Sequence, residues 1–224
     1  MSIRRLTERD IQHLCTGAMF VACTVDHATC LHYRDLLLDL MATSGRAPEL
    51  ITADELDPDD VTCSIGYVNK GLMFSEMMPM GDELESALAR LQGRLGVPVR
   101  GVYPLAAASV NALVPVYLAL RTGRPVVDAD PMGRVFPLLQ HTTLALAGLS
   151  AGPIGLTGPT GETAVLEVES PVRAERLVRA LAAELGGWAA TASYPVTAAE
   201  LGRYGIAGSV SRLIEIGQVL DAPR

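Results

Sequence analysis

The stretch R-T-G-R-P-V-V-D-A-D-P-M-G-R-V-F-P-L-L-Q-H-T-T, from Arg121 to Thr143, decides the fold of this chain. A helix is expected to end at Gly123, and a short apolar strand then runs from Pro125 into two aspartates, Asp128 and Asp130. In an open α/β sheet, ligands bind outside the carboxyl ends of the strands. The two carboxylates are therefore candidates for a binding or catalytic site.

Size and composition favour a large α/β domain with a small-aliphatic core. The chain has 224 residues, of which 49% are hydrophobic and only 4% are aromatic. Such a chain can bury a core without disulfides or a structural metal, and its composition is typical of helices packed on a mostly parallel sheet. The formal net charge of −7 argues against nucleic acid and against an anionic membrane surface as partners.

The ends and the cysteines of the sequence suggest a cytoplasmic protein. The first residues, M-S-I-R-R-L-T-E-R-D, lack the apolar core and the cleavage site of a signal peptide. No apolar run reaches the length needed to span a bilayer. The four cysteines are then expected to be reduced thiols.

Strand and helix patterns alternate along the chain. Helices are expected to begin near residues 8, 34, 82, 111, 136, 171 and 209, and strands to cover 61–68, 97–103, 125–128 and 188–194. Pro115 should make its helix kink or start late. Residues 150–168 are expected to form an antiparallel hairpin that turns at Pro159–Gly161. The order predicts a three-layer α/β/α sandwich with a mostly parallel sheet.

The run from Gly123 to Thr143 resembles the central motif of the S-methyl-thiohydantoin desulfurase family. Gly81–Leu84 opening a helix, Asn111–Leu113 followed by Pro115, and the run A-E-R-L-V-R-A-L-A-A-E-L-G-G agree with the same family. The resemblance implies that residues 1–224 form a single domain like the family's N-terminal α/β domain. It also implies that the usual C-terminal β-rich domain is absent here, so that a second protein chain or a second copy of this chain would close the cleft.

Two segments depart from the pattern of the family. Family members carry a glycine-rich segment where this chain has F-V-A-C-T-V-D-H-A-T, residues 20–29. They also carry a glutamate before a pair of glycines, where this chain has Ala106 and Ala108–Ser109. The residues that match the family are Asn111, Asp128, Asp130, Gly133, Arg134 and Gln140. The resemblance therefore implies a retained cleft with altered reactive groups.

The matching residues suggest roles in a small-molecule site. Residues two apart at a strand end point to the same side, so Asp128 and Asp130 are candidate catalytic residues that hold and polarise a ligand nitrogen. Asn111, Arg134 and Gln140 are candidate substrate-binding residues, with Arg134 suited to an anionic group. The alternative is structural: Asp128 caps the following turn or helix, and Asp130 pairs with Arg134.

The segment that replaces the glycines contains a second set of candidates. Asp26 and His27 offer a general base and an imidazole that titrates near neutral pH, so both are candidate catalytic residues. The alternative is a histidine in an ordinary surface turn. No cofactor is expected, although Cys23, His27 and Cys30 form a set that a zinc ion could use.

These features together suggest a small-molecule enzyme without a redox cofactor. Acid–base and displacement chemistry on a nitrogen-containing substrate would fit, as in a bacterial tailoring enzyme that closes a small aziridine-like ring with loss of sulfate. One alternative is a thiohydantoin-type desulfurase or hydrolase like the family. Another is a binding or regulatory subunit without catalytic activity.

Overall fold

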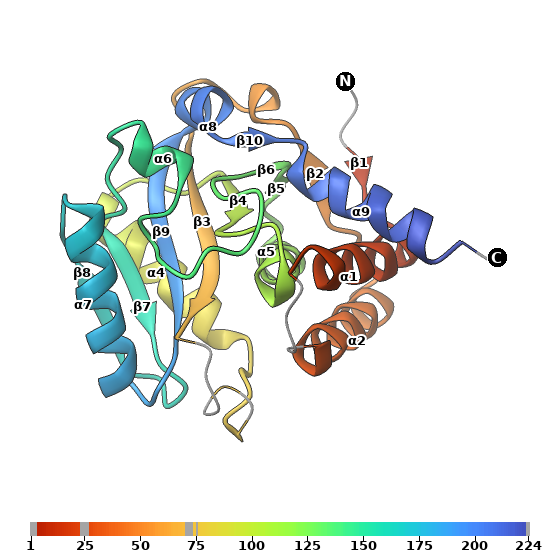
Figure 1. Ribbon diagram of the computed structural model, residues 1–224, viewed down its shortest axis with the longest axis horizontal. Helices are drawn as coiled ribbons and strands as arrows, with labels where there is room; N and C mark the ends of the chain where they lie inside the picture. Colours follow the sequence, from red (N-terminus) through yellow and green to blue (C-terminus); the bar gives the residue numbers. More distant parts are fainter. Residues whose placement is uncertain (1–3, 23–26, 70–73, 75, 223–224) are drawn as a thin grey trace.

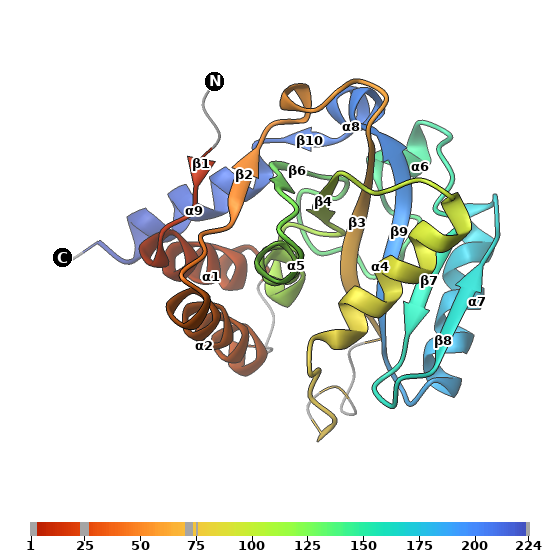
Figure 2. The same ribbon diagram turned by 180° about the vertical axis from the view of Figure 1, so that it is seen from behind.

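The computed structural model describes residues 4–22, 27–69, 74 and 76–222, which form a mixed α/β structure. Among these described residues, eight strands form one sheet in the order β1-β2-β5-β4-β3-β9-β7-β8 (Figures 1 and 2). Their bounds in that order are Arg4–Arg5, Glu49–Ile51, Val126–Val127, Gly101–Pro104, Val61–Val68, Ala189–Thr197, Ile154–Thr157 and Thr163–Leu166. A further pair, β6 (Ala129–Asp130) and β10 (Ile206–Ala207), is antiparallel.

The centre of the sheet is parallel and its flanks are antiparallel. Strands β2, β5, β4 and β3 run in the same direction. Strand β9 pairs antiparallel with both β3 and β7, and β7 forms the expected antiparallel hairpin with β8. The predicted fold class, with helices on both faces of a mostly parallel sheet, is confirmed.

Helices cover both faces of this sheet. One face packs against α1 (Glu8–Ala22), α2 (His27–Ser44), α4 (Asp82–Leu95), α5 (Val114–Thr122) and α9 (Ser209–Leu220). The other face packs against α6 (Thr143–Leu146), α7 (Pro171–Glu184) and α8 (Ala198–Tyr204). Figure 1 shows α7 in front of the sheet, and Figure 2, seen from behind, shows α4 crossing the opposite side. No helix in the described parts of the chain has the length and apolar character needed to cross a membrane.

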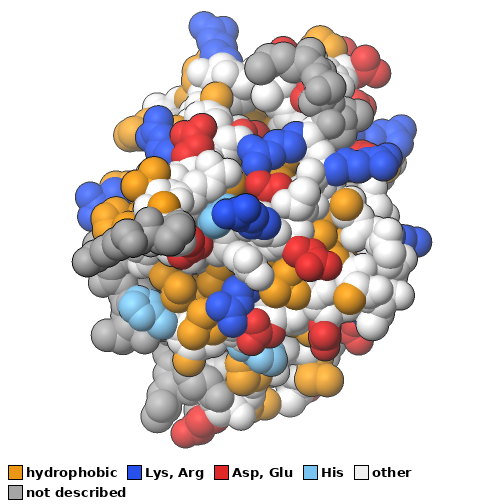
Figure 3. Space-filling model, turned by 90° about the vertical axis from the view of Figure 1, so that its right-hand side faces the viewer, with side chains coloured by type: hydrophobic (Ala, Val, Ile, Leu, Met, Phe, Trp, Pro, Cys, Tyr) orange, Lys and Arg blue, Asp and Glu red, His pale blue; other side chains and the backbone are white. Residues whose placement is uncertain are grey.

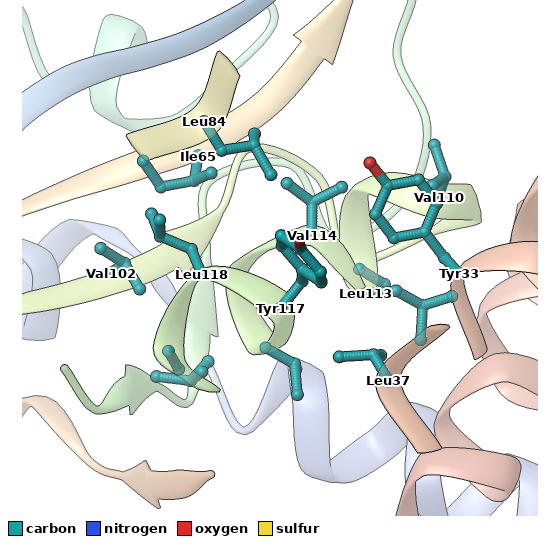
Figure 4. Close-up of a cluster of buried hydrophobic side chains, with 14 of the residues drawn as sticks. Tyr33, Leu37, Ile65, Leu84, Val102, Val110, Leu113, Val114, Tyr117 and Leu118 are labelled. Atoms are coloured by element: carbon teal, nitrogen blue, oxygen red, sulfur yellow. The ribbon is translucent and has the colours of Figure 1, made fainter. Parts of the chain in front are cut away.

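The larger core cluster lies where α2, α4 and α5 meet the sheet (Figure 4). Its labelled side chains are almost all aliphatic: Tyr33, Leu37, Ile65, Leu84, Val102, Val110, Leu113, Val114, Tyr117 and Leu118. Each buried leucine or valine stabilises the fold by roughly 1.5–3 kcal/mol relative to an exposed one. The cluster therefore holds the first two helices against the centre of the sheet.

Most predicted helices form where their sequence signals lie. Helix α4 buries Leu84, Leu88 and Leu91 on one stripe and ends at Gly96, whose φ is 71°. Helix α5 starts late, at Val114, because Pro115 occupies its first turn. Helix α2 begins at His27, earlier than the expected start at residue 34.

The helix expected near residues 136–146 does not form as predicted. Only Thr143–Leu146 is helical, and Thr142 caps it by accepting the N–H of Ala145 at 3.0 Å. Pro137 supplies no N–H and disfavours helical backbone at Phe136, which explains the irregular path before the cap. In Figure 1 this green segment between β6 and α6 crosses in front of β3.

Helices α1 and α9 cross at close range through two glycines. A Cβ added at Gly17 would lie 1.9 Å from the Leu213 carbonyl oxygen, and one at Gly217 would lie 1.9 Å from that of His13. Only glycine allows this approach. On the side of the molecule formed by α1, α2 and α9, basic side chains are scattered among acidic and hydrophobic ones (Figure 3).

Candidate functional site

A pocket of about 180 Å³ lies at the carboxyl ends of the parallel strands β3 and β4. This is the edge at which open α/β sheets bind ligands. The residues around it come from the ends of the two strands, from η2 (Ser109–Ala112), from the irregular segment before α6, and from α7: Tyr67, Val68, Asn69, Leu105, Ala106, Ala108, Asn111, Met132, Val135, Phe136, Pro137, Leu138, Leu139, Glu175 and Arg179.

Asn111, a predicted substrate-binding residue, lies in this pocket. Its side-chain oxygen accepts the N–H of Tyr67 at 2.9 Å, and its amide nitrogen donates to the carbonyl of Tyr67 at 3.3 Å. The short η2 turn presents it, and Ser109 in that turn has a φ of 54°. These bonds fix the orientation of the amide and leave one N–H of its NH₂ group for a ligand.

The pocket floor contains two of the positions at which the sequence departs from the family pattern. Ala106 and Ala108 both line it, together with Leu105. Methyl groups therefore stand where the resemblance suggested a carboxylate and a glycine. On the opposite side, Asn69 donates its amide N–H to the carbonyl of Gly187 at 2.6 Å.

Asp130 lies below the floor and is fully buried. Its Oδ2 accepts the N–H groups of Ala107, Met132 and Gly133 at 2.9, 3.0 and 2.7 Å. Burial raises the pKa of the carboxyl above its ordinary value, and these backbone hydrogen bonds counteract the rise only in part. Asp130 thus ties the segments after β4 and β6 together rather than lining the pocket.

Asp128 has a different set of partners, at the start of α9. Its Oδ1 accepts the N–H groups of Val210 and Ser211 at 2.9 and 3.0 Å, and its Oδ2 accepts the Ser211 hydroxyl at 2.5 Å. The carboxylate therefore caps a helix N-terminus, where negative charge is favourable. The expectation that Asp128 and Asp130 face one ligand is not met, because neither lines the pocket and each has separate partners.

Arg134 and Gln140 lie beside the pocket and do not line it. The Arg134 guanidinium lies over the Phe136 ring, with 5.6 Å between Cζ and the ring centroid. Among the described residues Arg134 has no ion pair with Asp130, contrary to the structural alternative for that residue. Gln140 lines a neighbouring apolar pocket, and its Oε1 is buried without a hydrogen-bond partner in the described structure.

The residues predicted from the replaced glycine segment are only partly described. Asp26 and Cys23 lie outside the described residues, so the structure gives no position for them. His27 is exposed at the start of α2, and Cys30 is buried in the same helix, with the Cys15 thiol donating to its carbonyl at 3.5 Å. The described residues contain no cluster of three or more histidine, cysteine and carboxylate side chains placed to hold a metal ion.

Two pocket residues were not identified from the sequence. Glu175 is 7% exposed and accepts the N–H of Leu139 at 2.6 Å and the Nε–H of Arg179 at 2.5 Å. Arg179 also donates from Nη2 to the carbonyl of Pro137. The pair lies in the run A-E-R-L-V-R, which has the pattern of an ordinary amphipathic surface helix, so local sequence gave no signal for a site.

The comparisons with known proteins identify two matched regions. A family model described as the S-Me-THD-like N-terminal domain matches residues 9–168, and the S-Me-THD-like C-terminal domain model matches 169–224. A comparison with curated protein sequences gave no match. A crystal structure of a protein from Chromobacterium violaceum aligns with a TM-score of 0.78 and 21% identity, over 97% of this chain and 61% of that chain.

These matches correct the predicted domain content. The expectation that the family's C-terminal domain is absent is wrong, because residues 169–224 match its model. In the structure this region contributes β9 to the sheet, between β3 and β7, and supplies Glu175 and Arg179 to the pocket. The pocket is therefore formed by both matched regions of one chain, which spans about three fifths of the structural relative's length.

Proposed function

Because the chain belongs to the S-Me-THD-like family, we propose that it binds a small nitrogen-containing ring compound of the thiohydantoin type and acts on it as an enzyme. The observation that carries this proposal is the pocket at the carboxyl ends of β3 and β4, with walls from both family-matched regions. This position is where the fold class binds ligands.

The pocket suits a small ring better than a large ligand. Its volume of about 180 Å³ is below the range of roughly 300–1,000 Å³ that is usual for drug-sized ligands. Leu105, Ala106 and Ala108 give an apolar floor, and the Asn111 amide provides a fixed polar group beside it. A flat ring with carbonyl and N–H groups at its edge matches this distribution.

Two reactions fit such a ligand. In the reaction like that of the family, water attacks the ring carbon that bears sulfur, and a thiol leaves as the ring carbonyl forms. In the other, a substrate amine loses a proton and displaces a neighbouring leaving group such as sulfate, which closes an aziridine-like ring. Asp26 and His27 are the proposed proton-transfer groups, with no redox cofactor.

A second candidate function is a binding or regulatory subunit without catalysis, and one observation favours it. Among the described pocket residues, the carboxylate of Glu175 is occupied by Arg179 and Leu139. The Tyr67 hydroxyl bonds that of Tyr33 at 2.7 Å, and burial raises the pKa of Tyr67 well above its ordinary value. Among the described side chains that line the pocket, none that could transfer a proton is thus left without a protein partner.

The test is to incubate the chain with S-methyl-thiohydantoin and to measure binding by calorimetry and thiol release by a colorimetric thiol assay. Binding with thiol release supports the enzyme, and binding without turnover supports the subunit. If neither S-methyl-thiohydantoin nor hydantoin binds, the proposal is wrong.

His27→Ala provides the matching test of proton transfer. We expect this variant to bind the ligand and to unfold at an unchanged temperature, but to lose about 10²-fold or more in turnover. His32→Ala, which changes another exposed histidine of α2, is the matched control and should keep full turnover. Full turnover by the His27 variant would remove His27 from the mechanism.

A further inference from the structure

The two edges of the large sheet differ in how they are protected against further pairing. Among the described strands, β1 forms one edge and β8 the other, and Figures 1 and 2 show β8 at the outer side of the sheet. Strand β1 consists of Arg4 and Arg5 alone, and a very short, charged strand is typical of a protected edge. Strand β8, Thr163–Leu166, contains no charged residue and no proline, and it pairs with β7 without a register shift. The β8 edge is therefore open to another strand.

The hydrogen bonds of the hairpin show which backbone groups face this open edge. The Gly158 N–H donates to the Glu162 carbonyl at 2.9 Å, so these two residues form a hydrogen-bonded pair next to the turn. Such pairs alternate with non-hydrogen-bonded pairs along an antiparallel ladder, and β8 keeps one register with β7. The N–H and C=O groups of Thr163 and Val165 therefore point away from β7. The alternation, continued by one residue, places those of Glu167 on the same side.

The side chains of these three outward-pointing residues lie on one face of the sheet. Ala164 and Leu166 are partly buried and pack against the core on the α7 side. Because successive strand residues point to opposite faces, Thr163, Val165 and Glu167 lie on the side of α4. Val165, in the middle of the three, is 41% exposed. The open edge thus presents an apolar side chain between two polar ones.

An antiparallel copy of this strand fits the edge in one register. With a two-fold axis at Val165, this residue pairs with its own copy, and Thr163 pairs with Glu167 of the partner subunit. All three outward-pointing residues then exchange backbone hydrogen bonds. An axis at Thr163 would instead place Gly161, a turn residue with a φ of 92°, opposite Val165. An axis at Glu167 would set two carboxylates directly opposite each other, which is destabilising.

The side chains also agree with an axis at Val165. The two valines would cover each other, and cross-strand pairs of β-branched residues stabilise a sheet. The Glu167 carboxylate accepts Nε and Nη2 of Arg94 in α4 at 2.5 and 2.7 Å, so the Thr163 hydroxyl of the partner subunit would meet a compensated charge. Leu177 of α7 is an exposed apolar side chain beside Glu167, and it adds apolar surface next to the same edge.

We propose that two copies of this chain associate through β8, which pairs antiparallel with its copy about Val165 and joins the two sheets into one. The partner is a second copy because this edge is its own complement, as an isologous interface requires. Thr163, Val165 and Glu167 do not line the pocket at the ends of β3 and β4. The inference is therefore independent of the proposed function.

The first experiment measures the molar mass of the full chain by sedimentation equilibrium at increasing protein concentration. We expect the wild type to pass from monomer to dimer. Val165→Pro removes an N–H that makes no bond within the chain, and it should weaken association by at least about tenfold. Val165→Thr keeps this N–H and the β-branched shape, so it is the matched control and should associate like the wild type. Thermal unfolding checks that each variant is folded.

A cysteine at the axis tests the register of the pairing. The Cα atoms of a hydrogen-bonded antiparallel pair are about 5.5 Å apart, which a disulfide can bridge. Val165→Cys treated with oxidised glutathione should therefore form a disulfide-linked dimer on a non-reducing gel. Val219→Cys, at a position in α9 that is 76% exposed, is the control and should stay monomeric. The wild-type chain gives the background from its four native cysteines.

Three results would overturn the proposal. The first is a wild type that stays monomeric at every concentration. The second is a dimer that Val165→Pro leaves unchanged, because the second copy then binds at another surface. The third is equal cross-linking of Val165→Cys and Val219→Cys. If Val165→Pro does not fold, the cross-linking comparison decides the result.

Discussion

Asp130 connects the two backbone segments that lie beneath the pocket floor. Its Oδ2 holds three backbone N–H groups from two separate segments, and its Oδ1 is buried without a partner in the described structure. Because burial raises its pKa, the folded state binds a proton at this carboxyl more tightly than the unfolded chain does. Asp130 therefore contributes a pH-dependent part to the free energy of unfolding.

The direction in which this contribution to the free energy of unfolding changes with pH gives a prediction for Asp130→Asn. A raised pKa in the folded state stabilises the protein below the ordinary pKa of 3.8, and this stabilisation is lost as the pH rises through the folded-state value. Asparagine keeps an acceptor oxygen for the backbone N–H groups but does not ionise. The stability of the wild type relative to the variant should therefore fall as the pH rises above about 4.

The measurement is the free energy of urea unfolding of both chains across that pH range. Groups other than Asp130 cancel in the difference between the chains. A difference that increases with pH, or that stays constant, would contradict the assignment of a raised pKa to Asp130.

The sequence identified the aspartates but not their roles. Two acids after a short apolar strand indicate a strand end, and that inference depends only on neighbours in the chain. The groups that Asp128 caps, Val210 and Ser211, lie some 80 positions later, so no local pattern could reveal them. Arg179 was missed as a pocket residue for the same reason: its place in the pocket lining depends on which loop α7 packs against.

At the scale of elements, the crossing of α1 and α9 depends on the absence of a side chain at two positions. Gly217 sits against the backbone of His13 in α1, with room for hydrogen only. Gly217→Ala should force the two helices apart and destabilise the fold by about 1–3 kcal/mol, the usual range for overpacking. Thermal or urea unfolding measures this loss.

Gly93→Ala is the matched control for that variant. Gly93 is also inside a helix, α4, but a Cβ added there meets nothing within 4 Å. Alanine at this position should stabilise the protein by roughly 0.5–1 kcal/mol through helix propensity. If both variants lower the stability equally, close helix packing is not the reason for Gly217.

Elements with strong local signals were predicted, and those set by tertiary contacts were not. Helix α9 has an amphipathic stripe and formed at Ser209–Leu220 as expected. The segment before α6 was expected to belong to a helix over residues 136–146. Instead, the Leu139 N–H donates to Glu175 and the Leu139 carbonyl accepts the Tyr194 hydroxyl at 2.9 Å. Those long-range partners, together with Pro137, replace the helix by a pocket wall.

At the scale of the whole molecule, the two family-matched regions share one sheet. Strand β9, from the second region, lies between β3 and β7 from the first, and α9 packs against α1. The resemblance to an N-terminal domain led to the expectation that the cleft is closed by a second chain or a second copy. That partner remains a proposal, which light scattering of the purified chain would test.

The shared sheet predicts that the first region does not fold alone. A chain ending at Val168 would leave β3 and β7 without their common neighbour and Asp128 without the helix that it caps. It should show no cooperative thermal transition by circular dichroism, and adding a peptide of residues 169–224 should restore one. A cooperative transition in the shortened chain by itself would show that the regions are independent.

The central claim is that the pocket between these regions binds the ligand, and Ala106→Leu tests it most directly. The larger side chain fills part of the floor at a site that contributes no hydrogen bond to a ligand. Ala183→Leu, on the exposed face of α7, is the same change away from the pocket. Calorimetry with S-methyl-thiohydantoin should show binding weakened by about tenfold or more for Ala106→Leu, and unchanged for Ala183→Leu. Wild-type affinity in a folded Ala106→Leu chain would contradict the account, because the ligand would then bind elsewhere.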